Sequence, residues 1–259
     1  MNFFSKSICV VILLVITSIS DACETLTVNG ADHWYPYFSR HNPQHLGIMG
    51  DIVTRAAERV GIKIDLQPPM PWKRVLFDLG SGRLDIIAGS LKTQQREKKF
   101  NFSDAIHYVD LRVFVRRNRR FHFSQMSDLV GKTGGKLRGM SLGEKADEYS
   151  FNYLVIDDVP SPKSLFQMIE SGRLDYGIFY GSTGKQEVEK YNLTSTIEIL
   201  PRAVATEGLY IAFSKNSQCQ SKITLLNNEI KKMKKDGNIA PIIQYYYSAV
   251  ASQEMEGKK

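Results

Sequence analysis

Hydroxyl and guanidinium side chains are concentrated in a short polar stretch that follows an apolar run in the first half of the chain. Ser90, Thr93 and Arg96 lie in this stretch, and the apolar residues 86–88 come just before it. A planar guanidinium donates two parallel, charge-assisted hydrogen bonds to a carboxylate, and hydroxyl groups nearby add further donors. These residue types predict a site for a small anion with Arg96 at its centre.

A surface ion pair is the simpler interpretation of Arg96. Glu97 and Asp104 are close enough in sequence to neutralise its charge. The position of Arg96 favours the binding role, because the loops after the carboxyl ends of strands bind ligands in open α/β sheets.

The elements around this stretch can be predicted from apolar spacing and glycines. Leu76, Phe77 and Leu79 give residues 72–80 one apolar helical face, and Gly80 and Gly82 end that helix. The apolar run that follows is typical of a strand covered on both faces.

A second copy of this unit lies further along the chain. The motif Ser81-Gly82-Arg83-Leu84-Asp85 recurs letter for letter at residues 171–175, and both copies stand between helix-like residues and an apolar run. The repetition predicts two similarly built lobes whose strand-end loops face each other across a cleft.

Several short motifs occur in a fixed order along the chain: Trp34-Tyr35-Pro36-Tyr37, Gly47-x-x-Gly50-Asp51, Thr93-x-x-Arg96, Asp128-Leu129-x-Gly131-Lys132, the strand-like residues 209–215, and Met233-x-x-Asp236-Gly237. With this order the chain resembles the bacterial periplasmic solute-binding proteins of the amino-acid-binding type (family 3) over residues 24–250. The resemblance implies an α/β fold of two lobes, each with a mixed sheet, joined by a two-segment hinge around a ligand cleft. Lobe 1 would comprise residues 24–110 plus 206–259, and lobe 2 residues 111–205.

The resemblance also implies a set of ligand-binding residues. In that family an arginine at the place of Arg96 holds the carboxylate of the ligand, hydroxyl donors assist it, and aromatic side chains line the cleft mouth. The implied ligand-binding residues are Trp34, Trp72, Ser90, Thr93, Arg96, Ser141 and Tyr180.

One position departs from the family pattern. The acidic residue that usually holds the ammonium group of an amino acid is replaced here by Tyr180, which carries no negative charge. Lys92 adds a positive charge beside Arg96. The ligand can therefore be an amino acid, an anionic or aromatic-bearing compound, or a cationic amine held by cation–π contact.

Three functions remain open from the sequence. The first is a non-catalytic, monomeric binding protein that captures a small carboxylate-bearing solute and passes it to an ABC-type permease or a sensor. The second is an enzyme on the same fold, such as a cyclohexadienyl or arogenate dehydratase, with Asp32, His33, Glu144 or Glu207 as a general acid. The third is an interaction module whose cleft binds nothing. We expect the first.

Composition and motif spacing argue against other classes. The formal net charge is +7, and its densest cluster, residues 116–120, lies in no nucleic-acid-binding motif, so we expect a solvated basic surface. The histidines and cysteines lack metal-ligand spacing. The glycines at 131–135 lack the spacing of a phosphate loop. We therefore expect no cofactor and no metal.

The N-terminus has the composition of an export signal. Lys6 precedes an apolar run at residues 8–16, and small residues follow near Ala22, which predicts a signal peptide over residues 1–22 and a periplasmic protein. Cys23 comes next and could carry a lipid, although the residues before it match a lipobox poorly. Cys23 and Cys219 can form a disulfide or remain two free thiols.

Overall fold

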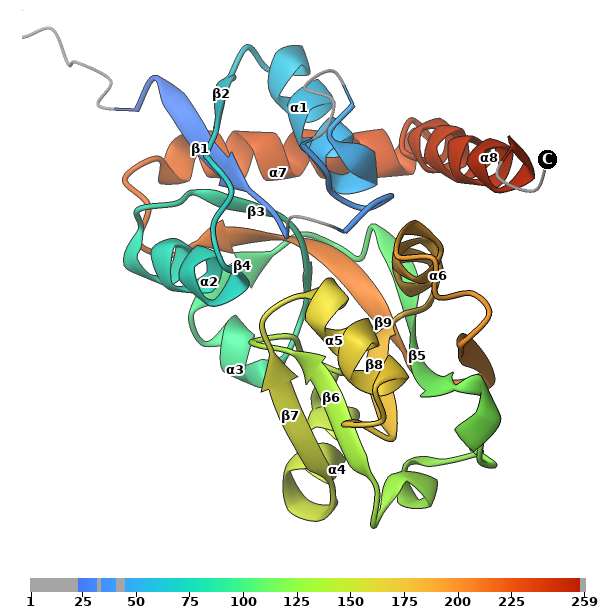
Figure 1. Ribbon diagram of the computed structural model, residues 1–259. Helices are drawn as coiled ribbons and strands as arrows, with labels where there is room; N and C mark the ends of the chain where they lie inside the picture. Colours follow the sequence, from blue (N-terminus) through green and yellow to red (C-terminus); the bar gives the residue numbers. More distant parts are fainter. Residues whose placement is uncertain (1–22, 32–33, 41–44, 257–259) are drawn as a thin grey trace, which may run out of the picture.

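The computed structural model describes residues 23–31, 34–40 and 45–256 (Figure 1). The predicted signal peptide, Asp32 and His33 lie outside the described residues. The strands are β1 (Thr25–Asn29), β2 (Lys63–Leu66), β3 (Ile86–Leu91), β4 (Phe100–Phe102), β5 (His107–Arg116), β6 (Thr133–Leu137), β7 (Val155–Val159), β8 (Tyr176–Tyr180) and β9 (Ile197–Ser214). The helices are α1 (Gly47–Arg59), α2 (Trp72–Ser81), α3 (Gln94–Glu97), α4 (Glu144–Tyr153), α5 (Pro162–Glu170), α6 (Gly181–Lys190), α7 (Gln220–Lys235) and α8 (Ala240–Glu256).

Within the described residues the strands form a mixed sheet in the order β2-β1-β3-β9-β5-β8-β6-β7, and β4 pairs with β9. In lobe 1, β1 is parallel to both β2 and β3. In lobe 2, β6 is parallel to both β7 and β8. Figure 1 shows the blue, cyan and red segments of lobe 1 above the green and yellow segments of lobe 2. This arrangement confirms the predicted two-lobed α/β architecture.

The two lobes are joined by β5 and β9, which pair with each other antiparallel. The predicted lobe boundaries fall inside these strands, where Asp110 lies opposite Thr206 and Leu111 opposite Ala205. The hinge is therefore a hydrogen-bonded pair of strands, and the sheets that were expected separately in each lobe join through it. The exact boundaries stay a prediction.

The repeated pentapeptide has the same local structure in both lobes. Gly82 and Gly172 follow α2 and α5 with φ values of 80° and 77°, a conformation that glycine adopts without steric cost. The aspartate that ends each copy accepts a backbone hydrogen bond from a neighbouring parallel strand: Thr27 N–H lies 2.8 Å from Asp85 Oδ2, and Thr133 N–H lies 2.8 Å from Asp175 Oδ2. The motif thus fixes where a strand begins, and its role is structural.

Other elements differ from the sequence expectation. The sequence predicts a helix that starts at Gly50-Asp51, but α1 starts at Gly47. Asp51 therefore lies in its second turn, where its carboxylate accepts hydrogen bonds from Leu46 N–H and from the Tyr246 hydroxyl. The apolar runs at 197–200 and 206–213 predict two strands, which the structure shows as one strand, β9. The sequence also predicts a short last helix at 239–246, whereas α8 continues to Glu256.

Cys23 and Cys219 form a disulfide with their Cα atoms 5.4 Å apart. The Cys23 sulfur is therefore engaged, which contradicts the alternative of a lipid attached to that atom. No helix in the described part of the chain is long and apolar enough to cross a membrane. Among the same residues, no group of three or more histidine, cysteine or acidic side chains is placed to hold a metal ion.

Candidate ligand-binding cleft

A cavity of about 560 Å³ lies between the lobes. Lobe 1 contributes residues of the loop after β1, of the loop before α2, of α2 itself, of β3 and of α3. Lobe 2 contributes the end of β6 with the residues after it, the connection from β7 into α5, and the last residue of β8. Its lining includes five of the seven predicted ligand-binding residues: Trp34, Trp72, Ser90, Arg96 and Tyr180.

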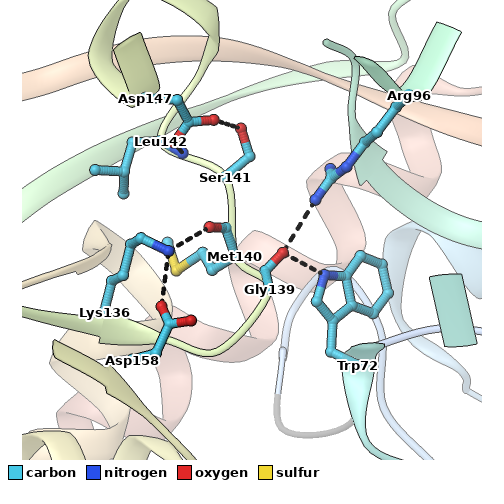
Figure 2. A network of polar contacts seen from close by, with 9 residues as sticks. All are labelled: Trp72, Arg96, Lys136, Gly139, Met140, Ser141, Leu142, Asp147 and Asp158. Atoms are coloured by element: carbon cyan, nitrogen blue, oxygen red, sulfur yellow. Dashed lines mark hydrogen bonds and ion pairs between the residues drawn. The ribbon is translucent and has the colours of Figure 1, made fainter. Parts of the chain in front are cut away.

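Arg96 is held in a fixed position by three hydrogen bonds. Its Nη1 donates to Ser90 Oγ at 3.1 Å and to the Leu91 carbonyl at 2.7 Å. Its Nη2 donates across the cleft to the carbonyl of Gly139 at 3.2 Å (Figure 2). These contacts orient a guanidinium that lines the cavity, which is the arrangement that recognition of a carboxylate requires.

The alternative of a surface ion pair for Arg96 is not observed within the described chain. The Glu97 carboxylate instead pairs with Lys92, whose Nζ lies 2.9 Å from Glu97 Oε1. Lys92 is also absent from the cavity lining, so it does not supply the additional positive charge that was expected beside Arg96. Burial lowers the pKa of Arg96, while Tyr180 and Asp147 act in the opposite direction.

Ser90 and Thr93 support Arg96 from its own lobe. Ser90 is almost fully buried, and its hydroxyl donates to the Leu91 carbonyl while accepting from Arg96. Thr93 caps the short helix α3, where its Oγ1 accepts the Arg96 backbone N–H at 3.2 Å. The hydroxyl groups thus position the side chain and the backbone of the arginine.

Gly139 of lobe 2 contacts Arg96 and Trp72 of lobe 1. Its carbonyl accepts hydrogen bonds from both Arg96 and the indole Nε1 of Trp72, the latter at 3.2 Å (Figure 2). A side chain at this position would lie 3.0 Å from Lys73 Cγ and 3.3 Å from Trp72 Cδ1, and the φ of Gly139 is +80°. Glycine is needed here because both its backbone conformation and the close approach exclude a larger residue.

Trp34 and Tyr180 form an aromatic wall that spans the two lobes. Their ring centroids are 4.6 Å apart, and Trp34 is almost fully buried. Burial raises the pKa of the Tyr180 phenol, and the nearby Arg96 only partly opposes this shift. Tyr180 is therefore neutral and cannot provide the negative charge of the acid it replaces.

Thr93 and Ser141 lie at a neighbouring cavity of about 570 Å³, which shares Arg96, Lys73 and Met140 with the first. The Ser141 hydroxyl donates to the Asp147 carboxylate and accepts the Gly143 N–H. The structure therefore gathers five of the predicted residues around the first cavity and separates Thr93 and Ser141 from it.

The lobes also meet on the other sides of the cleft. The hydroxyls of Tyr37 and Ser182 are 3.1 Å apart, and Thr183 Oγ1 donates to the Tyr35 carbonyl at 3.0 Å. At the opposite side Gln94 N–H donates to a Glu144 carboxylate oxygen at 2.9 Å. With these contacts the structure is a closed arrangement of the two lobes.

Sequence reasoning missed part of the lining. Lys73 and Arg138 contribute cations, and an apolar wall is contributed by Met70, Pro71, Leu137, Met140 and Pro162. Arg138 could have been found from the sequence, because it is a basic residue in the loop after the end of a strand, β6. In contrast, Glu144 and Glu207, which were candidates for a general acid, line neither cavity. Burial, followed by the charges of Asp147 and Glu144, raises the pKa of Glu207.

Two lobes joined by paired strands, with a cavity closed between them, define the class of two-lobed solute-binding proteins. The chain belongs to the bacterial extracellular solute-binding proteins, family 3, whose sequence model matches residues 26–249. The described residues include all of the matched range except residues 32–33 and 41–44.

Three relatives illustrate the similarity. The L-cystine-binding protein TcyA of Bacillus subtilis (strain 168) is 24% identical over 233 residues, which cover 88% of this chain and 82% of TcyA. A histidine kinase sensor domain with similarity to periplasmic binding proteins superposes with a TM-score of 0.73 at 19% identity, covering 87% of this chain and 97% of the domain. The amino acid ABC transporter substrate-binding protein AbpA of Streptococcus pneumoniae, bound to L-arginine, has a TM-score of 0.69 at 20% identity, covering 88% and 96%.

Proposed function

We propose that the protein captures a small carboxylate-bearing solute, an amino acid or a related compound, in the cavity between its lobes. The observation that carries this proposal is the guanidinium of Arg96, which lines the cavity and is oriented by Ser90, Leu91 and Gly139. The carboxylate would bind to Arg96, and the rings of Trp34, Trp72 and Tyr180 would contact the body of the solute.

Capture in this cleft supports a role in uptake or sensing outside the cytoplasm. The similarity to an ABC transporter protein and to a sensor domain makes a membrane permease and a membrane sensor the two candidate partners. The predicted signal peptide would export the protein to the periplasm, where we expect it to act as a monomer with no cofactor. Neither cavity is lined by Glu144 or Glu207, so nothing favours the dehydratase alternative.

A thermal-shift screen of the purified protein tests the function. The panel contains L-amino acids including L-cystine and L-arginine, small carboxylates without an amine, and amines without a carboxylate. A ligand that binds only the folded state raises the melting temperature according to its concentration and Kd. We expect stabilisation by carboxylates and none by the amines. Stabilisation by amines alone would contradict the proposal.

Calorimetry on Arg96→Ala then tests the assigned residue. Removing one partner of a hydrogen-bonded charge pair costs on the order of 2–5 kcal/mol of binding free energy, so binding of the best carboxylate should fall below detection. Arg96→Lys keeps the charge without the planar fork and should retain weak binding. Arg55→Ala, an exposed position on α1, is the matched control. Unchanged affinity in a folded Arg96→Ala protein would exclude Arg96 as the carboxylate ligand.

A further inference from the structure

We infer that the solute carries a second anionic group, which binds between Lys73 and Arg138 while its first carboxylate binds Arg96. This inference rests on the proposed function and narrows the class of ligand to small molecules with two anionic groups, in the first place dicarboxylates. Lys73, Arg96 and Arg138 all line the same cavity, and no described lining residue is acidic.

The two additional cations come from opposite lobes. Lys73 belongs to α2, and Arg138 directly follows β6. The two lobes are close at this point, because a Cβ placed on Gly139, the residue after Arg138, would lie 3.0 Å from Lys73 Cγ. An anion bound between them would contact both lobes, as Arg96 does through Gly139.

Neither cation is neutralised by the protein. Within the described chain, the side chains of Lys73 and Arg138 have no ion pair and no hydrogen bond. Other basic side chains near the cleft are engaged: Lys92 pairs with Glu97, and Lys136 lies 3.0 Å from Asp158 and also donates to the Met140 carbonyl. Two unpaired cations that line one cavity give it a positive potential, which attracts an anion.

Lys73 also lines the neighbouring cavity, which contains the carboxylates of Asp147 and Asp158. Both carboxylates already have partners. Asp147 accepts hydrogen bonds from the Ser141 hydroxyl and from Leu142 N–H, and Asp158 pairs with Lys136 (Figure 2). These acids therefore leave the Lys73 ammonium available to a ligand.

The wall of the cavity indicates the shape of the solute. The residues beside the cations are apolar, namely Met70, Pro71, Leu137, Met140 and Pro162. They would cover a hydrocarbon or thioether segment that separates the two anionic groups. The expected ligand is an elongated molecule with a charge at each end and an apolar middle.

The test compares probes that differ only in the second charge. Binding is measured by calorimetry for glutarate against monomethyl glutarate, L-glutamate against L-glutamine, and L-cystine against its monomethyl ester. O-phospho-L-serine against L-serine asks whether the second group is a phosphate instead of a carboxylate. We expect the member with the second anionic group to bind about fivefold to tenfold more tightly than its partner in at least one pair.

The same pair is then measured with Lys73→Gln/Arg138→Gln. This double variant should abolish the preference for the ligand with the second anionic group, so that both members of the pair bind with the same affinity. Lys63→Gln/Arg55→Gln removes the same charge from exposed positions outside the cleft and should preserve the preference. Ligand-free melting temperatures check that each variant is folded.

The outcomes separate the two proposals. Equal binding of both members of every pair overturns the inference and leaves the carboxylate-binding function intact. A preference for the ligand with two anionic groups that persists in the double variant also overturns the inference. A preference for O-phospho-L-serine that depends on Lys73 and Arg138 supports it with phosphate as the second group. If wild type binds none of the carboxylates, both the inference and the proposed function fail.

Discussion

Arg96 can serve as a ligand for a carboxylate because residues of its own lobe hold it in place. The Ser90 hydroxyl and the Leu91 carbonyl fix one nitrogen, and Thr93 fixes the backbone. A side chain restrained in this way loses little conformational entropy on binding, so more of the interaction energy appears as affinity. Under the proposed function, the binding strength of the cleft would thus depend on hydroxyl groups that need not touch the solute.

The two aspartates of the repeated motif provide a matched pair for stability. Asp85 accepts hydrogen bonds from Thr27 N–H, from the Thr27 hydroxyl and from the Ser217 hydroxyl, whereas Asp175 accepts the Thr133 N–H. Leaving a buried donor unsatisfied costs about 1–3 kcal/mol. Asp175→Ala should therefore lower the free energy of unfolding by about that amount, and Asp85→Ala by more. Urea titration checks the order, which a larger effect at Asp175 would contradict.

At the residue scale, the sequence predicted the arginine and the aromatic residues that line the cavity, including Tyr180 of lobe 2, but missed Arg138 and Gly139 of that lobe. Arg96 and Tyr180 stand in motifs whose spacing locates them after strands. Arg138 and Gly139 stand in a loop whose path depends on how the lobes close, and no local spacing encodes that closure. The ion pair between Lys92 and Glu97 could not be predicted either, because from the sequence Glu97 could pair with Lys92 or with Arg96.

At the scale of elements, the strand β9 is continuous where two strands were expected, and it contains Pro201. In the structure the register with β5 shifts at this place, so that Arg112 pairs with Ala203 and Phe114 with Ile199. The intervening residues of β9 form a bulge, which accommodates a residue without an N–H donor.

Because α8 is longer than expected, it contacts β5, one of the two strands of the hinge. Tyr247 of α8 lies with its hydroxyl 2.8 Å from His107 Nε2 of β5, and the same hydroxyl is 3.2 Å from that of Tyr37. A prediction of a short C-terminal helix could not include this contact. The helix connects the end of the chain to the strand that links the lobes.

The burial of His107 makes stability depend on pH. Burial lowers the pKa of His107 from its ordinary value of 6.5. The unfolded chain then binds more protons than the folded one below pH 6.5, so stability falls as the pH drops from 6.5 through the folded pKa. His107→Gln should reduce the loss of melting temperature between pH 7 and pH 5, a range of about two units around the ordinary pKa of histidine. An identical pH profile in the variant would contradict the assignment.

At the scale of the whole molecule, the disulfide connects residues near opposite ends of the described chain. Cys23 precedes β1 and Cys219 is the N-cap residue of α7, at a sequence separation of 196. A cross-link that closes so long a loop restricts the unfolded chain strongly and stabilises by about 2–4 kcal/mol. Cys23→Ala/Cys219→Ala should lose this stability in chemical denaturation. Wild type treated with reductant should match the double variant, whereas two thiols reactive without reductant would exclude the bridge.

The architecture as a whole was predictable because it is encoded twice. The motif ending in Asp85 recurs at Asp175, and each copy places a helix, a glycine turn and a buried strand in the same relation. The joining of both halves into one sheet was not predictable, since it depends on the pairing of β5 with β9 over a long sequence separation. Long-range pairing leaves no periodic signal in either strand.

The acceptor that lobe 2 offers to Arg96 and Trp72 is a main-chain oxygen. A main-chain oxygen is present whatever amino acid occupies a position, so point substitutions in lobe 2 cannot delete it directly. Its placement depends instead on the length and path of the turn after β6. Among descendants of this chain, insertions and deletions in that turn would consequently change how closely the two lobes approach each other. The cations beside the turn could be substituted independently, as the proposed solute changes.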